Sequence, residues 1–428
     1  MAMNPGDEAP PSQAPVMTKA QVATRMPIFG TIAAVWGPGL LVMLADTDAG
    51  NIVTAAEAGA RWGYRLLPLP LLLIPVLILV QDIAVKFGIF RGCGFGELIR
   101  ERFGRTGAWL AAIALVLATL GSLVTELTGI AGVGELYGAS RWLVLPLASA
   151  TLVLVVLTGE YRRVERVALL FGLFEVSFFV VAWQSHPSGS DIMRDMADQR
   201  LADLSYLYLG AGLIGATFNP WMIFYQASAI AEKRLSVSDY SAARWDTIAG
   251  AILTQLITAS VLVAIAALNR HAAGSSLDDI GQISEVLTPL LGQFTGRLVF
   301  SVGVVGAAMA AAIVSSLACA WGLGEIFGLK RSLEQAARHH YGFSAGYSVW
   351  VVGSAVLVLF VPDLVSLSIG MQVLNAVLLP LIVILLVILA ATALPARARL
   401  RGWQLWLTAG TLGLVALAGI VGALAGLP

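Results

Sequence analysis

The chain has 428 residues, of which only 12% are charged and 58% are hydrophobic, and its mean hydropathy is +0.84. A soluble protein of this length needs more charged residues to cover its surface, which excludes an ordinary globular enzyme and predicts a lipid bilayer as the main solvent. The formal net charge is zero, so a nucleic acid finds no basic surface to bind. The two cysteines, Cys93 and Cys319, predict neither a disulfide framework nor a metal site.

The first 27 residues are polar and rich in proline, and we expect a disordered cytosolic tail there. Eleven apolar stretches follow, close to the roughly 20 residues of helix that cross the hydrocarbon core of a bilayer. Their continuous apolar character favours helices over the alternating strands of a barrel. The expected spans cover residues 31–56, 64–88, 108–134, 142–159, 164–184, 205–232, 246–268, 297–327, 346–362, 365–394 and 403–426. The predicted fold class is therefore an all-α integral membrane protein.

Lysine and arginine predict the orientation of these spans. With a cytosolic N-terminus, most of these residues fall in cytosolic connections, as the positive-inside rule requires. The two long connections on the other side are acidic and contain Asp191, Asp195, Asp198 and Asp203 in the first and Asp278, Asp279 and Glu285 in the second. An odd number of spans places the C-terminus outside, and we expect a protein of the plasma (inner) membrane.

Two spans contain residues that interrupt a transmembrane helix, because proline removes an amide donor and glycine weakens a helix. These residues are Asp46, Asp48, Ala49, Gly50 and Asn51 in the first span, and Asn219 and Pro220 in the sixth. The two spans open on similar sequences, GPGLL and GAGLI, and an offset of five spans gives their units opposite directions. This pattern predicts an inverted-repeat transporter with its site at paired broken helices. The units are residues 28–200 and 201–395, and an additional span lies within 396–428.

The breaks favour a cation as ligand. Backbone carbonyls around Ala45 and Ala216 lose their intrahelical donors there and carry partial negative charge beside Asp48. Asn51 and Asn219 add amide oxygens, and all four histidines fall in connections, so the donor set is typical of a hard cation rather than zinc. Asp48 has a simpler alternative role as the cap of the restarted helix.

Other polar residues are expected near this site. Asp46 is predicted as a ligand or vestibule residue, and Trp221 as a pore-lining residue or an ordinary packing residue. Gln372 and Asn375, one turn apart in the tenth span, are predicted either to close the site or to join helices by hydrogen bonds. Glu126 is buried in the third span and needs a proton or polar neighbours.

The run GPGLLVMLADTDAGN resembles the first span of the Nramp family of divalent-metal transporters, in which Asp48, Gly50 and Asn51 match and Ala49 replaces a proline. The similarity continues through WGYRLL, GELIRERFG, TELTG, GATFNPWMIFYQAS and QVLNAVLLP, and so covers nearly the whole membrane region. The resemblance implies a LeuT-type fold of two five-helix inverted repeats with broken helices 1 and 6. It also implies a divalent metal ion as transported substrate, with no cofactor.

The departures from the Nramp pattern concern selectivity and proton movement. Asn219 stands where the family has a methionine whose sulfur contacts transition metals, which exchanges a soft ligand for a hard one. Trp221 and Gln226 stand at family histidine positions and Leu123 at an aspartate, whereas Glu126 is retained. These changes are similar to those of the Nramp-related magnesium transporters.

The sequence therefore predicts a carrier of Mg²⁺ or Mn²⁺ with weak or no proton coupling. The alternatives are a proton-coupled transition-metal importer of the standard Nramp type and a carrier of a small organic solute on the same architecture. The sequence predicts no oligomeric state.

Overall fold

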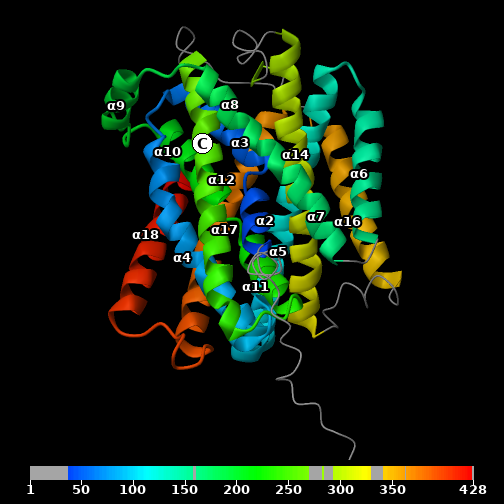
Figure 1. Cartoon of the computed structure of the whole chain (residues 1–428), viewed down its shortest axis with the longest axis vertical. Coiled ribbons are helices and arrows are strands. Elements are labelled where there is room, and N and C mark those ends of the chain that lie inside the picture. Colours follow the sequence, from blue (N-terminus) through cyan, green and yellow to red (C-terminus); the bar gives the residue numbers. More distant parts are fainter. Residues whose placement is uncertain are drawn as a thin grey trace, which may run out of the picture.

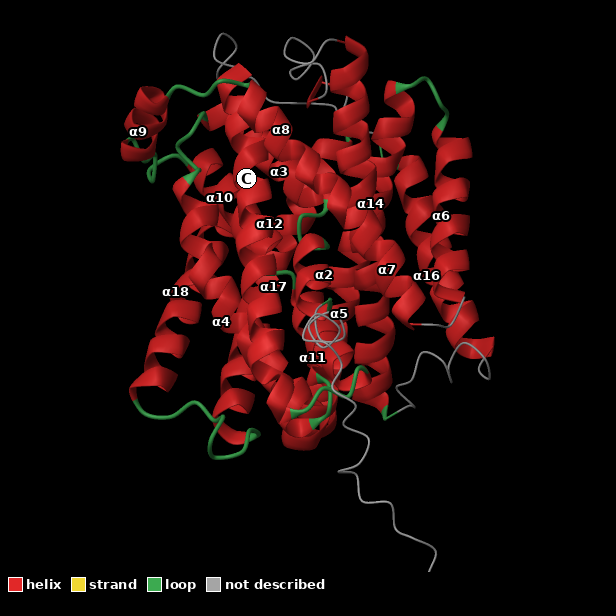
Figure 2. Cartoon of the chain, viewed as in Figure 1, coloured by secondary structure: helices red, strands yellow, loops and turns green. Residues whose placement is uncertain are grey.

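The computed structural model describes residues 37–157, 161–268, 282–283, 293–328, 341–361 and 363–426. Within these ranges the regular secondary structure is helical throughout, as Figure 2 shows. The predicted tail over residues 1–27 and the acidic residues Asp278, Asp279 and Glu285 lie outside the described residues.

The described parts of all eleven predicted spans form helices, and among the described residues eight segments are both long and apolar enough to cross a membrane. Large apolar side chains such as Trp183 and Trp406 are about four-fifths exposed, at 81% and 77%, as expected of a surface that faces lipid. In chain order the spans are α2 (Pro38–Leu44) with α3 (Ala49–Trp62), α4 (Pro68–Arg91), α5 (Phe95–Leu136), α6 (Arg141–Leu157), α7 (Tyr161–Gly172) with η1 (Leu173–Val176) and α8 (Ser177–Gln184), α10 (Leu204–Thr217) with α11 (Pro220–Glu232), α12 (Tyr240–Leu268), α14 (Gln293–Phe327), α16 (Tyr341–Phe360), α17 (Leu364–Thr392) and α18 (Trp403–Ala425).

Spans one and six are broken where the sequence predicts it. In span one the chain leaves the helix after Leu44 and restarts at Ala49, with Asp48 as the cap that accepts a hydrogen bond from the Asn51 amide at 2.6 Å. In span six the break falls at Phe218 and Asn219, and Pro220 occupies the first turn of α11, where its missing amide hydrogen costs nothing.

Two further irregularities were not predicted. α5 begins 13 residues before the expected span, at Phe95, and bends at Gly104, whose φ of 63° lies in the region that favours glycine. Span five passes through the 3₁₀ turn η1 at Glu175 instead of forming one continuous helix.

The broken helices lie in the middle of the bundle (Figure 1). α12 packs against both halves of span one, while α10 packs against α17 and α18. The end of α18 and the short helix α9 (Gly189–Ala197) lie at the upper end of the view, and the connection between α4 and α5 lies at the lower end. Both broken spans are therefore surrounded by scaffold helices.

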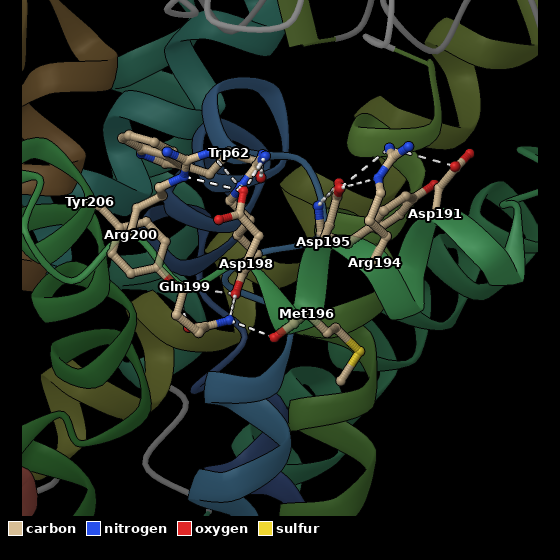
Figure 3. A network of polar contacts seen from close by, with 11 residues as sticks. Trp62, Asp191, Arg194, Asp195, Met196, Asp198, Gln199, Arg200 and Tyr206 are labelled. Atoms are coloured by element: carbon tan, nitrogen blue, oxygen red, sulfur yellow. Dashed lines mark hydrogen bonds and ion pairs between the residues drawn. The ribbon is translucent and has the colours of Figure 1, made fainter.

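α9 belongs to a connection in which the sequence predicted no helix. This connection forms hydrogen bonds with the turn between α3 and α4 (Figure 3). Arg65 donates from Nε and Nη2 to Asp198 Oδ2 at 3.0 and 2.9 Å. The Arg65 carbonyl accepts hydrogen bonds from Gln199 Nε2 at 2.9 Å and from the Tyr206 hydroxyl at 3.2 Å. We call this group the α9 clamp. Because Tyr206 lies on α10, the clamp ties the end of α3 to the start of α10.

The contacts of the α9 clamp depend on the negative charge of Asp198, and this charge persists in mild acid. Hydrogen bonds from Arg65 and Arg200 hold the pKa of Asp198 below its usual range. Since this pKa is lower in the folded chain than in the unfolded one, the contact contributes stability above the usual aspartate pKa of about 4. That contribution is lost only as the pH falls through the lowered value.

We predict that Asp198→Asn loosens α9 and the corner after α3, because the Arg65 guanidinium loses its ionised acceptor. Hydrogen–deuterium exchange should then accelerate over residues 189–199 and 62–66. The wild-type protection, corrected for intrinsic exchange, should be equal at pH 5 and pH 7. Glu135→Gln, which removes the ion pair to Arg141 elsewhere, is the control and should leave both segments unchanged. Unchanged exchange in Asp198→Asn would contradict the clamp.

Candidate cation site

The two helix breaks bring α3, α10 and α17 together through a chain of side-chain amides. Gln372 Nε2 donates to Asp48 Oδ1 at 2.9 Å, and Asn375 Nδ2 donates to Gln372 Oε1 at 3.1 Å. Asn375 Nδ2 also contacts Asn219 Oδ1, and Asn219 Nδ2 donates to Asp46 Oδ1 at 3.2 Å. Three amides thus connect the carboxylates of Asp46 and Asp48.

Glycine at two positions lets α17 approach this closely. A Cβ atom on Gly50 would overlap the Gln372 side-chain amide and lie 3.2 Å from Asp48 Oδ1. A Cβ atom on Gly215 would overlap the Gln372 backbone carbonyl. The predicted pairing of Gln372 with the site therefore depends on small residues in both broken spans.

The carboxylates of the site are buried and keep acceptor capacity. Asp46 and Asp48 are 0% exposed, and within the described chain the second oxygen of each, Oδ2, has no hydrogen-bond donor. Glu126 lies beside them, with Oε2 accepting a hydrogen bond from the Ala49 amide at 3.0 Å. Two carboxylates therefore cap the first turn of α3, where the helix dipole favours negative charge.

Three other predicted ligands are held by hydrogen bonds in this conformation. Asn51 Nδ2 donates to the Asp46 carbonyl at 3.2 Å, and Asn51 Oδ1 accepts from the Thr258 hydroxyl at 3.0 Å. The Ala216 carbonyl accepts from Asn219 Nδ2 at 3.2 Å, and Ala45 is the C-terminal cap of α2. Asn51 and Ala216 thus lie at the breaks, and each oxygen accepts one hydrogen bond and keeps a second lone pair for a further partner.

Two predicted pore residues lie on α11. Trp221 is fully buried there. Gln226 Nε2 donates to the Thr247 hydroxyl on α12 at 3.1 Å, away from the Asp48 cluster. The structure thus places Gln226 at a contact between α11 and α12.

α12 contributes hydroxyl groups that the sequence analysis missed. The hydroxyls of Thr47 and Thr254 form a short hydrogen bond, and Thr258 binds Asn51 as described above. Gln255 Nε2 donates to the Thr217 hydroxyl at 3.3 Å. The polar run Thr254-Gln255 with Thr258 one turn later, in an otherwise apolar span, was the available signal.

The cluster is buried within the bundle. Every predicted site residue has at most 3% exposure. On the side of the α4–α5 connection, Asp246 Oδ2 accepts the amides of Gly37 and Gly39 at 3.2 and 2.7 Å, and Lys233 pairs with Glu165 at 2.8 Å. On the other side, a cavity of about 360 Å³ lies between α9 and the end of α3.

The chemistry of the donors fits a hard cation. Within the described ranges, no three carboxylate, imidazole or thiol groups converge as a metal-binding set, and the other polar groups at the breaks include amide and carbonyl groups. Such oxygen ligands suit Mg²⁺, Ca²⁺ and Mn²⁺ better than soft metals.

Known proteins share this architecture. The family described as "Natural resistance-associated macrophage protein-like" (Nramp) matches residues 39–425. The divalent metal cation transporter MntH of Chromohalobacter salexigens is 28% identical over 298 residues, covering 66% of this chain and 68% of that protein. MntH 1 of Pseudomonas aeruginosa is 29% identical over 297 residues, with 66% and 67% covered.

Solved structures agree at the level of the fold. The manganese transporter of Eremococcus coleocola superimposes with a TM-score of 0.69 at 20% identity, covering 91% of this chain and 87% of that one. A nucleobase-cation-symport-1 family transporter gives a TM-score of 0.60 at 14% identity, with 91% and 90% covered. The chain has the LeuT-type fold with broken helices 1 and 6, and since the Nramp match extends from α2 through α18, it belongs to the Nramp family.

Proposed function

We propose that this protein takes up a divalent cation, Mg²⁺ or Mn²⁺, by alternating access with weak or no proton coupling. The observation that carries the proposal is the cluster of carboxylates and side-chain amides at the two helix breaks, in which Asn219 is hydrogen-bonded between Asp46 and Asn375. The names of the MntH relatives and of the manganese transporter support a divalent metal as substrate.

The orientation is part of the proposal. With the N-terminus cytosolic, the basic connection between α4 and α5 faces the cytosol, and the C-terminal end of α18 lies on the outer side with α9. Uptake across the plasma (inner) membrane then begins at the cavity below α9. Of the broken helices, α3 lines this cavity with its last residues, and the α9 clamp joins the end of α3 to α10.

The space around Asn219 argues against an organic solute. The cavity that Asn219 lines together with Gln81, Phe218 and Met222 has a volume of about 10 Å³, close to that of a single water probe. An organic molecule would need to displace the hydrogen-bonded amides of Gln372 and Asn375, whereas an ion can use their oxygens.

A proton-coupled transition-metal importer of the standard Nramp type is the second candidate, because Glu126 remains beside Asp48. Against it, Leu123 is a buried apolar residue, and Gln226 is engaged with Thr247. No histidine lies in any of the predicted spans, and of the four histidines only His186 falls within the described residues, after α8.

We predict that Asn219→Met raises the affinity for Mn²⁺ and Cd²⁺ relative to Mg²⁺, because a thioether favours polarizable ions. A tenfold change in the affinity ratio corresponds to about 1.4 kcal/mol. Isothermal titration calorimetry of the purified variants with each ion measures this ratio. Asn219→Leu is the matched control, because it also breaks the amide chain but supplies no sulfur. Equal ratios in the two variants would show that residue 219 does not face the ion.

We also predict that cation uptake moves no protons. Proteoliposomes that contain a pH-sensitive dye, under an inward Mg²⁺ or Mn²⁺ gradient and a clamped membrane potential, should accumulate the cation without a dye response. Histidine, the side chain best suited to exchange protons near neutral pH, is missing from the predicted spans. Acidification that scales with uptake and disappears in Glu126→Gln, but persists in the distant control Glu325→Gln, would restore the proton symporter.

A further inference from the structure

Glu175 is a fully buried carboxylate that the proposed divalent site does not use. It lies on η1, where span five leaves the α-helical conformation, and its exposure is 0%. Neither carboxylate oxygen accepts a hydrogen bond of good geometry within the described chain. A buried carboxylate with so few donors is costly in a membrane unless a proton or a cation accompanies it.

The surroundings of Glu175 are rich in oxygen and negative in charge. Its polar interactions are with the Thr47 side chain and with the carboxylates of Asp46 and Asp48. Thr47 lies in the unwound stretch between α2 and α3, and its hydroxyl also contacts the Thr254 hydroxyl of α12. The unwound stretch therefore has Glu126 near Ala49, and Glu175 near Thr47.

The lack of donors sets Glu175 apart from the other buried carboxylates. No ion pair found among the described residues links Asp46, Asp48, Glu126 or Glu175 to lysine, arginine or histidine. Asp46, Asp48 and Glu126 each accept a hydrogen bond on at least one oxygen, whereas both oxygens of Glu175 lack a donor of good geometry within the described chain. A cation beside Glu175 would give these two oxygens a partner.

We propose that Glu175, together with the hydroxyls of Thr47 and Thr254, forms a second cation site that binds Na⁺. Carboxylate and hydroxyl oxygens are hard donors, and the carbonyls of an unwound transmembrane segment provide further ligands for a monovalent ion. The site joins span five and α12 to the first helix break. It deepens the proposed function, since it gives the carrier a second ion beside the divalent one.

Binding of radioactive ²²Na⁺ to the purified full-length protein at fixed pH, without divalent cations, tests the site. Saturable binding is expected in the wild type and should weaken at least about tenfold, or 1.4 kcal/mol, in Glu175→Gln. The control Glu325→Gln alters another buried carboxylate, which accepts a hydrogen bond from Ser228 at 2.6 Å, and should bind Na⁺ normally. Mn²⁺ affinity in Glu175→Gln, measured without Na⁺, should stay within about threefold, or 0.7 kcal/mol.

Thr254→Val and Thr254→Ser provide a second test if Glu175→Gln does not fold. Valine keeps the shape but removes the hydroxyl and should weaken Na⁺ binding, whereas serine restores the oxygen and should recover it. Absence of saturable Na⁺ binding in the wild type, or equal binding in Glu175→Gln or Thr254→Val, would overturn the site. The Na⁺ binding assay contains no divalent cations, so its result does not depend on divalent transport. If the protein binds Na⁺ but transports no divalent cation, the proposed function is contradicted and the Na⁺ site is not.

Discussion

Buried carboxylates without a basic side chain are the constraint that the rest of this structure satisfies. Asp46 and Asp48 are completely buried at a helix break, where an uncompensated charge costs several kcal/mol. The restarted helix α3 supplies backbone amides to Asp48 and Glu126, and α17 supplies Gln372. These donors reduce the cost but add no positive charge. In the proposed function a bound cation supplies that charge, which would link binding to the folded geometry of the breaks.

The two ends of the broken helices are held by different groups, which suits alternating access. At one end, the α9 clamp joins the corner after α3 to α10 through Arg65 and Tyr206. At the other end, Asp246 on α12 holds the start of α2 through the amides of Gly37 and Gly39. The unwound residues between these attachments contain the carboxylates. Release at either end can therefore open a path to the same site without dismantling it.

The sequence predicted the parts of the fold that depend on composition and local breaks. Eleven apolar stretches gave the spans, and Asp48 and Asn219-Pro220 marked the two interruptions, because capping and proline act within a few residues. Gln372 and Asn375 were also predicted near the site, and the structure brings both to it.

Contacts between elements far apart in the sequence could not be predicted from local sequence patterns. The hydrogen bond from Arg65 to Asp198 joins residues 133 positions apart, and the bond from Thr258 to Asn51 joins residues 207 positions apart. Gln226 stays a predicted pore or gating residue, and its hydrogen bond to Thr247 could not be predicted, because the rotation of α11 depends on its packing neighbours. The 3₁₀ turn at Glu175 could not be predicted, because its residues Leu173–Val176 contain no proline or glycine.

The most direct test of the account is calorimetric titration of Mn²⁺ and Mg²⁺ into purified Asp48→Asn. Asparagine keeps the helix cap but removes the charge, so α3 should still form. Loss of a direct ligand should exceed the 10- to 100-fold effects of outer-shell changes, and we expect affinity to fall at least about 100-fold in a monodisperse, folded protein. Cation binding within about threefold of wild type would contradict the assignment of Asp48 and, with it, the carboxylate-centred site.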